Sequence, residues 1–83
     1  MAYWNHRVIQ QTLPNGELWY GIHEVFYNAD GSIYAYTEKP VGVSGDNVDE
    51  LREYIEWTLK GLDKPVLVAE EVVFVDRALE DAE

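Results

Sequence analysis

The stretch "LPNGELWYGIHEVFYNADGSI", residues 13–33, places two turn signals around a segment rich in aromatic and β-branched side chains. Pro14 holds φ at about −65°, and Gly16 supplies a positive φ two residues later. The second signal ends in the same way, on Gly31. Both signals favour a type I turn followed by a glycine bulge, which makes a three-residue hairpin loop. The chain is therefore expected to double back twice, with residues 18–28 as the central strand of an antiparallel sheet.

Two further strands and one helix complete the predicted architecture. The strands are expected at about 3–12 and 33–38, where β-branched and aromatic residues are again enriched. Asn47 and Glu50, three residues apart, resemble a capping box, and they open an amphipathic helix that is expected from about 48 to 62. We expect its apolar stripe to pack on the larger sheet face; the stripe consists of Val48, Leu51, Ile55, Leu59 and Leu62.

The predicted fold is a single α+β domain over residues 1–83. It is a three- to four-stranded antiparallel β-meander over about residues 3–38, with one α-helix packed on one face. The C-terminal part, 66–83, is expected to be a strand or a tail. Its β-branched residues fit strands at 66–69 and 72–75, although its valines also fit a helical stripe. A strand is the favoured interpretation for 72–75.

Composition narrows the classes of function. The 83 residues include no cysteine, which excludes a disulfide framework, a zinc knuckle and a thiol nucleophile. The formal net charge of −10 argues against direct nucleic-acid binding, because contact with phosphates needs clustered lysine and arginine. The longest apolar run is four residues, against about 20 for a membrane span. The N-terminus shows no signal-peptide pattern, so we expect a cytoplasmic protein without membrane contact.

One polar row is expected to cross the predicted sheet. The three-residue loops set His6 opposite Glu24 on one side and Tyr36 opposite Glu24 on the other. A carboxylate that faces a core needs a partner, so the row is interpreted as structural, with a contribution of roughly 0.2–1 kcal/mol per cross-strand pair. A two-residue loop would place Arg7 opposite Glu24 instead. In the alternative interpretation, His6, Glu24 and Tyr36 bind a small ligand or perform acid–base catalysis.

Metal and cofactor binding are not expected. His23 faces away from His6 in the predicted register, so the two histidines do not converge. A metal site would need three or four converging ligands, and the sequence contains no phosphate-binding loop or nucleophile motif.

Two surfaces are predicted to bind other molecules. The second sheet face carries aromatic and β-branched residues that would be exposed, and would mark an interface, unless residues 66–75 fold back over them. These residues are Trp19, Val25, Tyr27 and Ile33. The other surface is the acidic side of the helix, with Asp49, Glu50, Glu53 and Glu56.

Three stretches carry a family resemblance: "YGIHEVFYNADGSI", "YTEKPV" and "DELREYIEWTLKGLDKPVL". They resemble a family of small bacterial and phage proteins of uncharacterised activity. Its members share a Tyr-Gly-Ile-His-Glu-Val core, an Asp-Gly turn, a Thr-Glu-x-Pro-Val motif and a helix rich in Glu and Leu. The resemblance covers roughly residues 4 to 68. It supports the predicted fold and implies no activity.

These patterns favour a small, acidic, non-enzymatic protein-interaction module. A concrete form is an inhibitor, encoded by a phage or a bacterium, that presents helix carboxylates in place of phosphates to a basic surface of its target protein. One alternative is the ligand binder or enzyme described above. The other is a homodimer with a structural or regulatory role.

Overall fold

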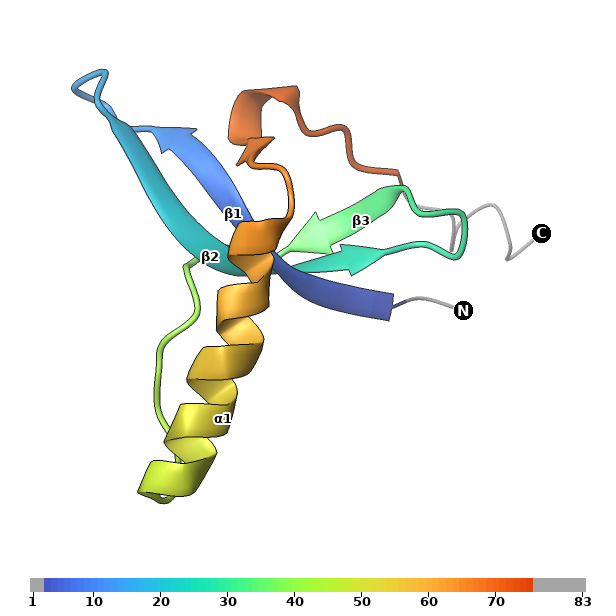
Figure 1. The fold of residues 1–83 in the computed structure, drawn as a ribbon. Coiled ribbons are helices and arrows are strands. Elements are labelled where there is room, and N and C mark those ends of the chain that lie inside the picture. Colours follow the sequence, from blue (N-terminus) through green and yellow to red (C-terminus); the bar gives the residue numbers. More distant parts are fainter. Residues whose placement is uncertain (1–2, 76–83) are drawn as a thin grey trace.

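The computed structural model describes residues 3–75, and it shows an α+β fold (Figure 1). The strands lie in the order β3-β2-β1-β4 in one sheet. The elements, in chain order, are β1 (Tyr3–Thr12), β2 (Leu18–Tyr27), β3 (Ile33–Tyr36), α1 (Val48–Leu59), the 3₁₀ helix η1 (Lys60–Asp63), β4 (Leu67–Val68) and the 3₁₀ helix η2 (Ala69–Glu71). The first three strands form the predicted antiparallel meander, whereas β4 pairs with β1 in parallel and makes the sheet mixed.

Both hairpin loops have the predicted geometry. Gly16 and Gly31 each adopt φ of 89°, the left-handed region that glycine enters without a steric penalty. The Gly16 N–H donates to the carbonyl of Leu13 at 2.8 Å, and the Gly31 N–H donates to that of Asn28 at 3.0 Å. The first hairpin therefore has the predicted register, in which His6 lies opposite Glu24.

The second hairpin departs from the predicted register because β3 contains a bulge. Next to the turn, Tyr27 pairs with Ile33, but the following pair is Phe26 with Ala35. β3 thus contains one extra residue, and every later side chain of that strand lies on the face opposite to the one predicted. Tyr36 consequently lies opposite Val25, so its predicted position opposite Glu24 is wrong.

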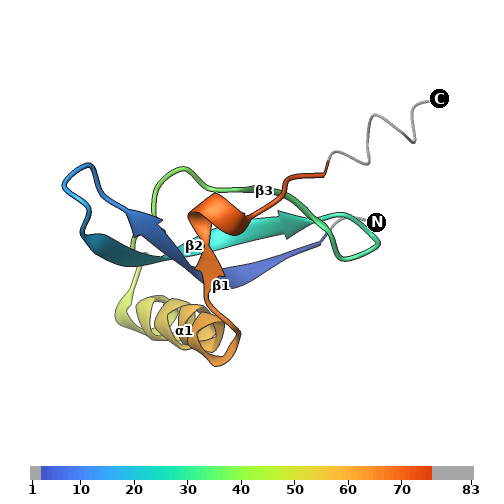
Figure 2. The same ribbon diagram turned by 90° about the horizontal axis from the view of Figure 1, so that it is seen from above.

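The hydrophobic core lies on the second sheet face, under the C-terminal segment. Its buried members are Ile9, Val25 and Tyr27. Partly buried residues pack against them, namely Ile33, Tyr36, Leu67 and Ala69. The segment that follows β4 crosses this face on the side opposite α1 (Figure 2).

The C-terminal segment is less regular than predicted. In the predicted strand 66–69, only Leu67–Val68 forms one, and it pairs with Ile9 and Gln10 of β1. Residues 72–75 are extended without forming a strand, so that prediction is wrong. They are held instead by single hydrogen bonds, such as that from the Val75 N–H to the Ile33 carbonyl at 2.8 Å. The predicted tail beyond residue 75 lies outside the described residues.

α1 begins and ends close to the predicted bounds. The Asn47 side chain accepts from the Glu50 N–H at 2.9 Å, and the Glu50 carboxylate accepts from the Asp46 N–H at 3.1 Å. The helix continues into η1, which lies against β1. The N-terminal half of α1 stands clear of the sheet (Figure 1). No helix in the described part of the chain is long and apolar enough to cross a membrane.

Candidate functional site

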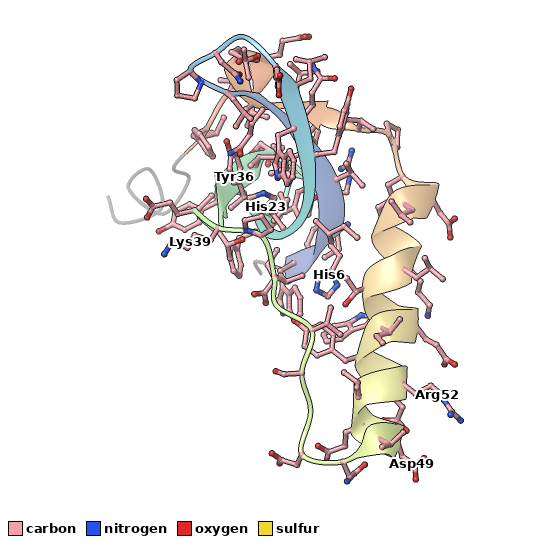
Figure 3. All side chains as sticks on the ribbon, turned by 90° about the vertical axis from the view of Figure 1, so that its left-hand side faces the viewer. His6, His23, Tyr36, Lys39, Asp49 and Arg52 are labelled. Carbon is pink, nitrogen blue, oxygen red and sulfur yellow. The ribbon has the colours of Figure 1, made fainter. Side chains whose placement is uncertain are left out.

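His6 is buried between the sheet and α1, with 3% of its surface exposed (Figure 3). Its ring lies edge-on to the indoles of Trp4 and Trp57, with centroid distances of 5.4 and 5.0 Å. Within residues 3–75, neither ring nitrogen finds a hydrogen-bond partner. Burial lowers the pKa of His6 below its usual 6.5, and the charge of Glu24 opposes this shift. His6 is therefore a neutral packing residue beneath the helix at pH 7.

Tyr36 belongs to a different environment, on the opposite face of the sheet. Its ring lies edge-on to His23, with 5.7 Å between the centroids. His23 is fully buried, and its Nδ1 lies 2.8 Å from the carbonyl oxygen of Thr37, to which it donates as the Nδ1–H tautomer. On the β3 side, Glu24 meets Thr37, whose N–H donates to the Glu24 carbonyl at 3.0 Å. The predicted row of three side chains is thus reduced to the pair of His6 and Glu24.

The two histidines do not converge on a metal site. His6 faces α1, whereas His23 lies against Tyr36 and Thr37 on the other side of the sheet (Figure 3). Among residues 3–75, no group of three or more histidine, aspartate or glutamate side chains could hold a metal ion.

The predicted aromatic binding face is largely occupied by the chain itself. Val25 and Tyr27 are buried, and Ile33 is partly buried against them. Tyr27 is also fixed by Arg7, whose Nη1 donates to its hydroxyl at 3.0 Å. Trp19 remains 58% exposed. The alternative in which residues 66–75 fold back over this face is confirmed, and Trp19 is the member of the predicted set that stays accessible.

The acidic residues of α1 are all exposed, as an interaction surface requires. Glu50 is engaged in the N-terminal cap, so its carboxylate serves the helix itself. Asp49, Glu53 and Glu56 follow one another at spacings of four and three residues and therefore share one side of the helix. Arg52 lies next to this acidic side of the helix and points away from the sheet (Figure 3).

α1 turns a different side toward the sheet from the one predicted. Trp57 packs against Trp4 at 4.8 Å between the centroids, and Tyr54 approaches His6 at 6.2 Å. Thr58 and Gly61 are buried on the same side. A Cβ on Gly61 would come within 2.9 Å of the His6 carbonyl oxygen, so glycine permits this close approach. Aromatic packing around a small residue has prevailed over the aliphatic stripe, which the prediction placed on the sheet.

The aliphatic stripe is consequently left at the surface. Val48, Ile55, Leu59 and Leu62 have between 45% and 69% of their surface exposed. An open groove of about 400 Å³ runs along the N-terminal half of this stripe; it is lined by Val48, Leu51, Arg52, Ile55 and Glu56. The sequence held a signal for this outcome, because Tyr54, Trp57, Thr58 and Gly61 form a second helical side that ends in a small residue.

Comparison with known proteins gives no assignment. No protein-family model matches the chain, and neither a curated protein nor a solved structure is similar to it. The family resemblance carried by residues 4–68 therefore stays a prediction.

Proposed function

We propose that this chain is a small non-enzymatic interaction module that binds a basic surface of a partner protein with the acidic side of α1. The single observation that carries the proposal is the position of α1. Its C-terminal end packs on β1 through Trp57 and Gly61, while its N-terminal half stands clear of the sheet (Figure 1), and its carboxylates are exposed. A helix held at one end presents its charges in a fixed arrangement, which lowers the entropy cost of binding.

The charge balance supports a basic partner. The formal net charge is −10, and Asp49, Glu53 and Glu56 lie on the solvent side of the projecting helix. Such a field accelerates encounter with a positively charged surface and disfavours acidic ones. A protein surface that normally receives nucleic-acid phosphates is the kind of target that fits this arrangement. An inhibitor that replaces the phosphates with carboxylates is the concrete form of the proposal.

The alternative chemical role of His6, Glu24 and Tyr36 loses its main support. Tyr36 packs against His23 on the other face of the sheet, and both nitrogens of His6 are buried against aromatic rings. A general acid or base must reach the proton that it transfers. We expect Glu24→Gln to leave partner binding intact.

Affinity capture from a lysate, with the full chain as bait, tests the proposal. The double variant Glu53→Lys and Glu56→Lys reverses two charges on the binding side. A matched control, Glu70→Lys with Glu71→Lys, makes the same change in net charge on exposed residues of η2. We expect the helix variant to lose a captured basic protein that the control retains, and the wild-type complex to weaken as salt is raised. Capture that survives both lysine substitutions in α1 would reject the proposal.

A further inference from the structure

We infer that the aliphatic stripe of α1 binds a second copy of this chain, in an antiparallel α1–α1 pair centred on Ile55. The stripe runs along the helix beside the side that contacts β1, from Val48 in the half that stands clear of the sheet to Leu62 in η1. Large aliphatic side chains that are exposed together on one side of a helix are typical of interfaces. The occupant follows from the symmetry of the stripe and from the two charges at its border.

The residues of the stripe have the same spacing in both directions along the helix. Its members are Val48, Leu51, Ile55, Leu59 and Leu62, with spacings of three, four, four and three residues. In an antiparallel pair related by a two-fold axis at Ile55, Leu51 meets the second copy's Leu59, Val48 meets the second copy's Leu62, and Ile55 meets itself. A two-fold interface requires this kind of self-complementarity, because the same patch supplies both sides.

The charged border of the stripe is also self-complementary. Arg52 and Glu56 lie one helical turn apart on the same edge of the groove. A two-fold axis perpendicular to α1 reverses the direction of the second helix but leaves its charged edge on the same side of the pair. Arg52 therefore lies beside the second copy's Glu56, and Glu56 lies beside the second copy's Arg52. At about 1.5 Å of rise per residue, Arg52 and the second copy's Glu56 are offset by about 3 Å along the helix axis. A parallel pair would place these edges on opposite sides of the interface and would form neither ion pair.

The fold leaves room for this arrangement. α1 contacts its own sheet through Tyr54, Trp57 and Gly61, which lie in its C-terminal half and in η1. The sheet lies at one end of α1 (Figure 1), so in an antiparallel pair the two sheets would lie at opposite ends. Asp49 and Glu53 stay on the outer side of each helix, so the pair would present the acidic surface twice. The dimer rests on the apolar stripe and on the Arg52 and Glu56 charges at its border, and it does not depend on the proposed partner.

Sedimentation at several concentrations tests whether the dimer exists. We expect a species of twice 9.6 kDa that dissociates on dilution. Ile55→Asp places two like charges on the axis, so we expect complete loss of the dimer at concentrations where the wild type is dimeric. Ile55 is 45% exposed in the isolated chain, and circular dichroism should therefore show the variant folded. Val73→Asp, the same kind of change at an exposed site on the C-terminal segment, should leave the dimer intact.

Cross-linking tests the orientation, because the chain has no cysteine of its own. Under mild oxidation Ile55→Cys should form a disulfide with itself, since the Cα atoms of a disulfide lie within about 7 Å. A mixture of Leu51→Cys and Leu59→Cys should give the mixed 51–59 product. Glu53→Cys, on the outer side, should remain reduced.

Three results would overturn the inference: a monomer at every concentration, a dimer that survives Ile55→Asp, or a 51–51 disulfide as the main product. Because Glu56 belongs to both contacts, the variants that separate this inference from the proposed function are Glu53→Lys, which should reduce partner capture alone, and Ile55→Asp, which should abolish the dimer alone. Charge exchange adds a further check: Arg52→Glu should weaken the dimer, and the combination of Arg52→Glu with Glu56→Arg should restore it.

Discussion

Replacing Gly61 with alanine tests the close packing of α1 and η1 against the sheet. An added Cβ would lie 2.9 Å from the carbonyl oxygen of His6, 3.0 Å from its carbonyl carbon and 3.1 Å from its Cβ. Two of these atoms belong to the backbone of β1, which is held between β2 and β4 in the sheet. Because the strand cannot move aside locally, η1 and the end of α1 must shift outward.

The size of the effect follows from two opposing contributions. Where the backbone is compatible and space is open, Gly→Ala raises the free energy of unfolding by about 0.4–1 kcal/mol, because the unfolded chain loses freedom. Overpacking a close contact costs about 1–3 kcal/mol. We therefore expect Gly61→Ala to lower the free energy of unfolding by about 1–2 kcal/mol, a large part of the modest stability of a domain of this size.

Urea unfolding monitored by circular dichroism measures the change, and tryptophan fluorescence reports on Trp57 where it packs against Trp4. Gly42→Ala is the matched control, because a Cβ at Gly42 would have no atom within 4 Å. It should be neutral or slightly stabilising. If Gly61→Ala proved as stable as this control with unchanged fluorescence, the close approach of η1 to β1 would be refuted.

Three further predictions concern the core, the helix cap and pH. Ile9→Ala removes a fully buried side chain, so the free energy of unfolding in urea should fall by about 2–5 kcal/mol; a loss below 1 kcal/mol would contradict the assigned core. Asn47→Ala removes the acceptor of the Glu50 N–H and should cost about 0.5–2 kcal/mol, whereas Asn47→Asp should stay near the wild type. The lowered pKa of His6 means that the unfolded chain binds a proton near pH 6.5 that the folded chain does not. The contribution of His6 to the free energy of unfolding is therefore complete above pH 6.5 and decreases below it. His6→Phe should flatten this dependence between about pH 7 and about pH 5.5 in urea titrations.

The sequence was most informative where local chemistry decides the structure. Gly16 and Gly31 determined both loops, and the first loop then determined the pairing of His6 with Glu24. The helix start followed from Asn47, because its side chain satisfies an N–H that would otherwise lack a partner.

The sequence was least informative where two packings compete. The bulge of β3 brings Tyr36 against His23 and Phe74, which are distant along the chain. The orientation of α1 depends on whether Trp57 or the aliphatic stripe finds the better surface, and only the assembled sheet decides between them. Both errors changed the candidate site: one separated Tyr36 from Glu24, and the other exposed the stripe around Ile55.

The parallel pairing of β4 with β1 has a consequence for the order in which the protein matures. Ile9 finds its partner Leu67 near the far end of the described chain, and loops of this length form slowly. During translation the first hairpin emerges early, but its apolar side stays open until residues 67–69 have left the ribosome. We therefore expect a nascent chain that stalls before Leu67 to be bound by chaperones and cleaved by proteases, although it already contains α1.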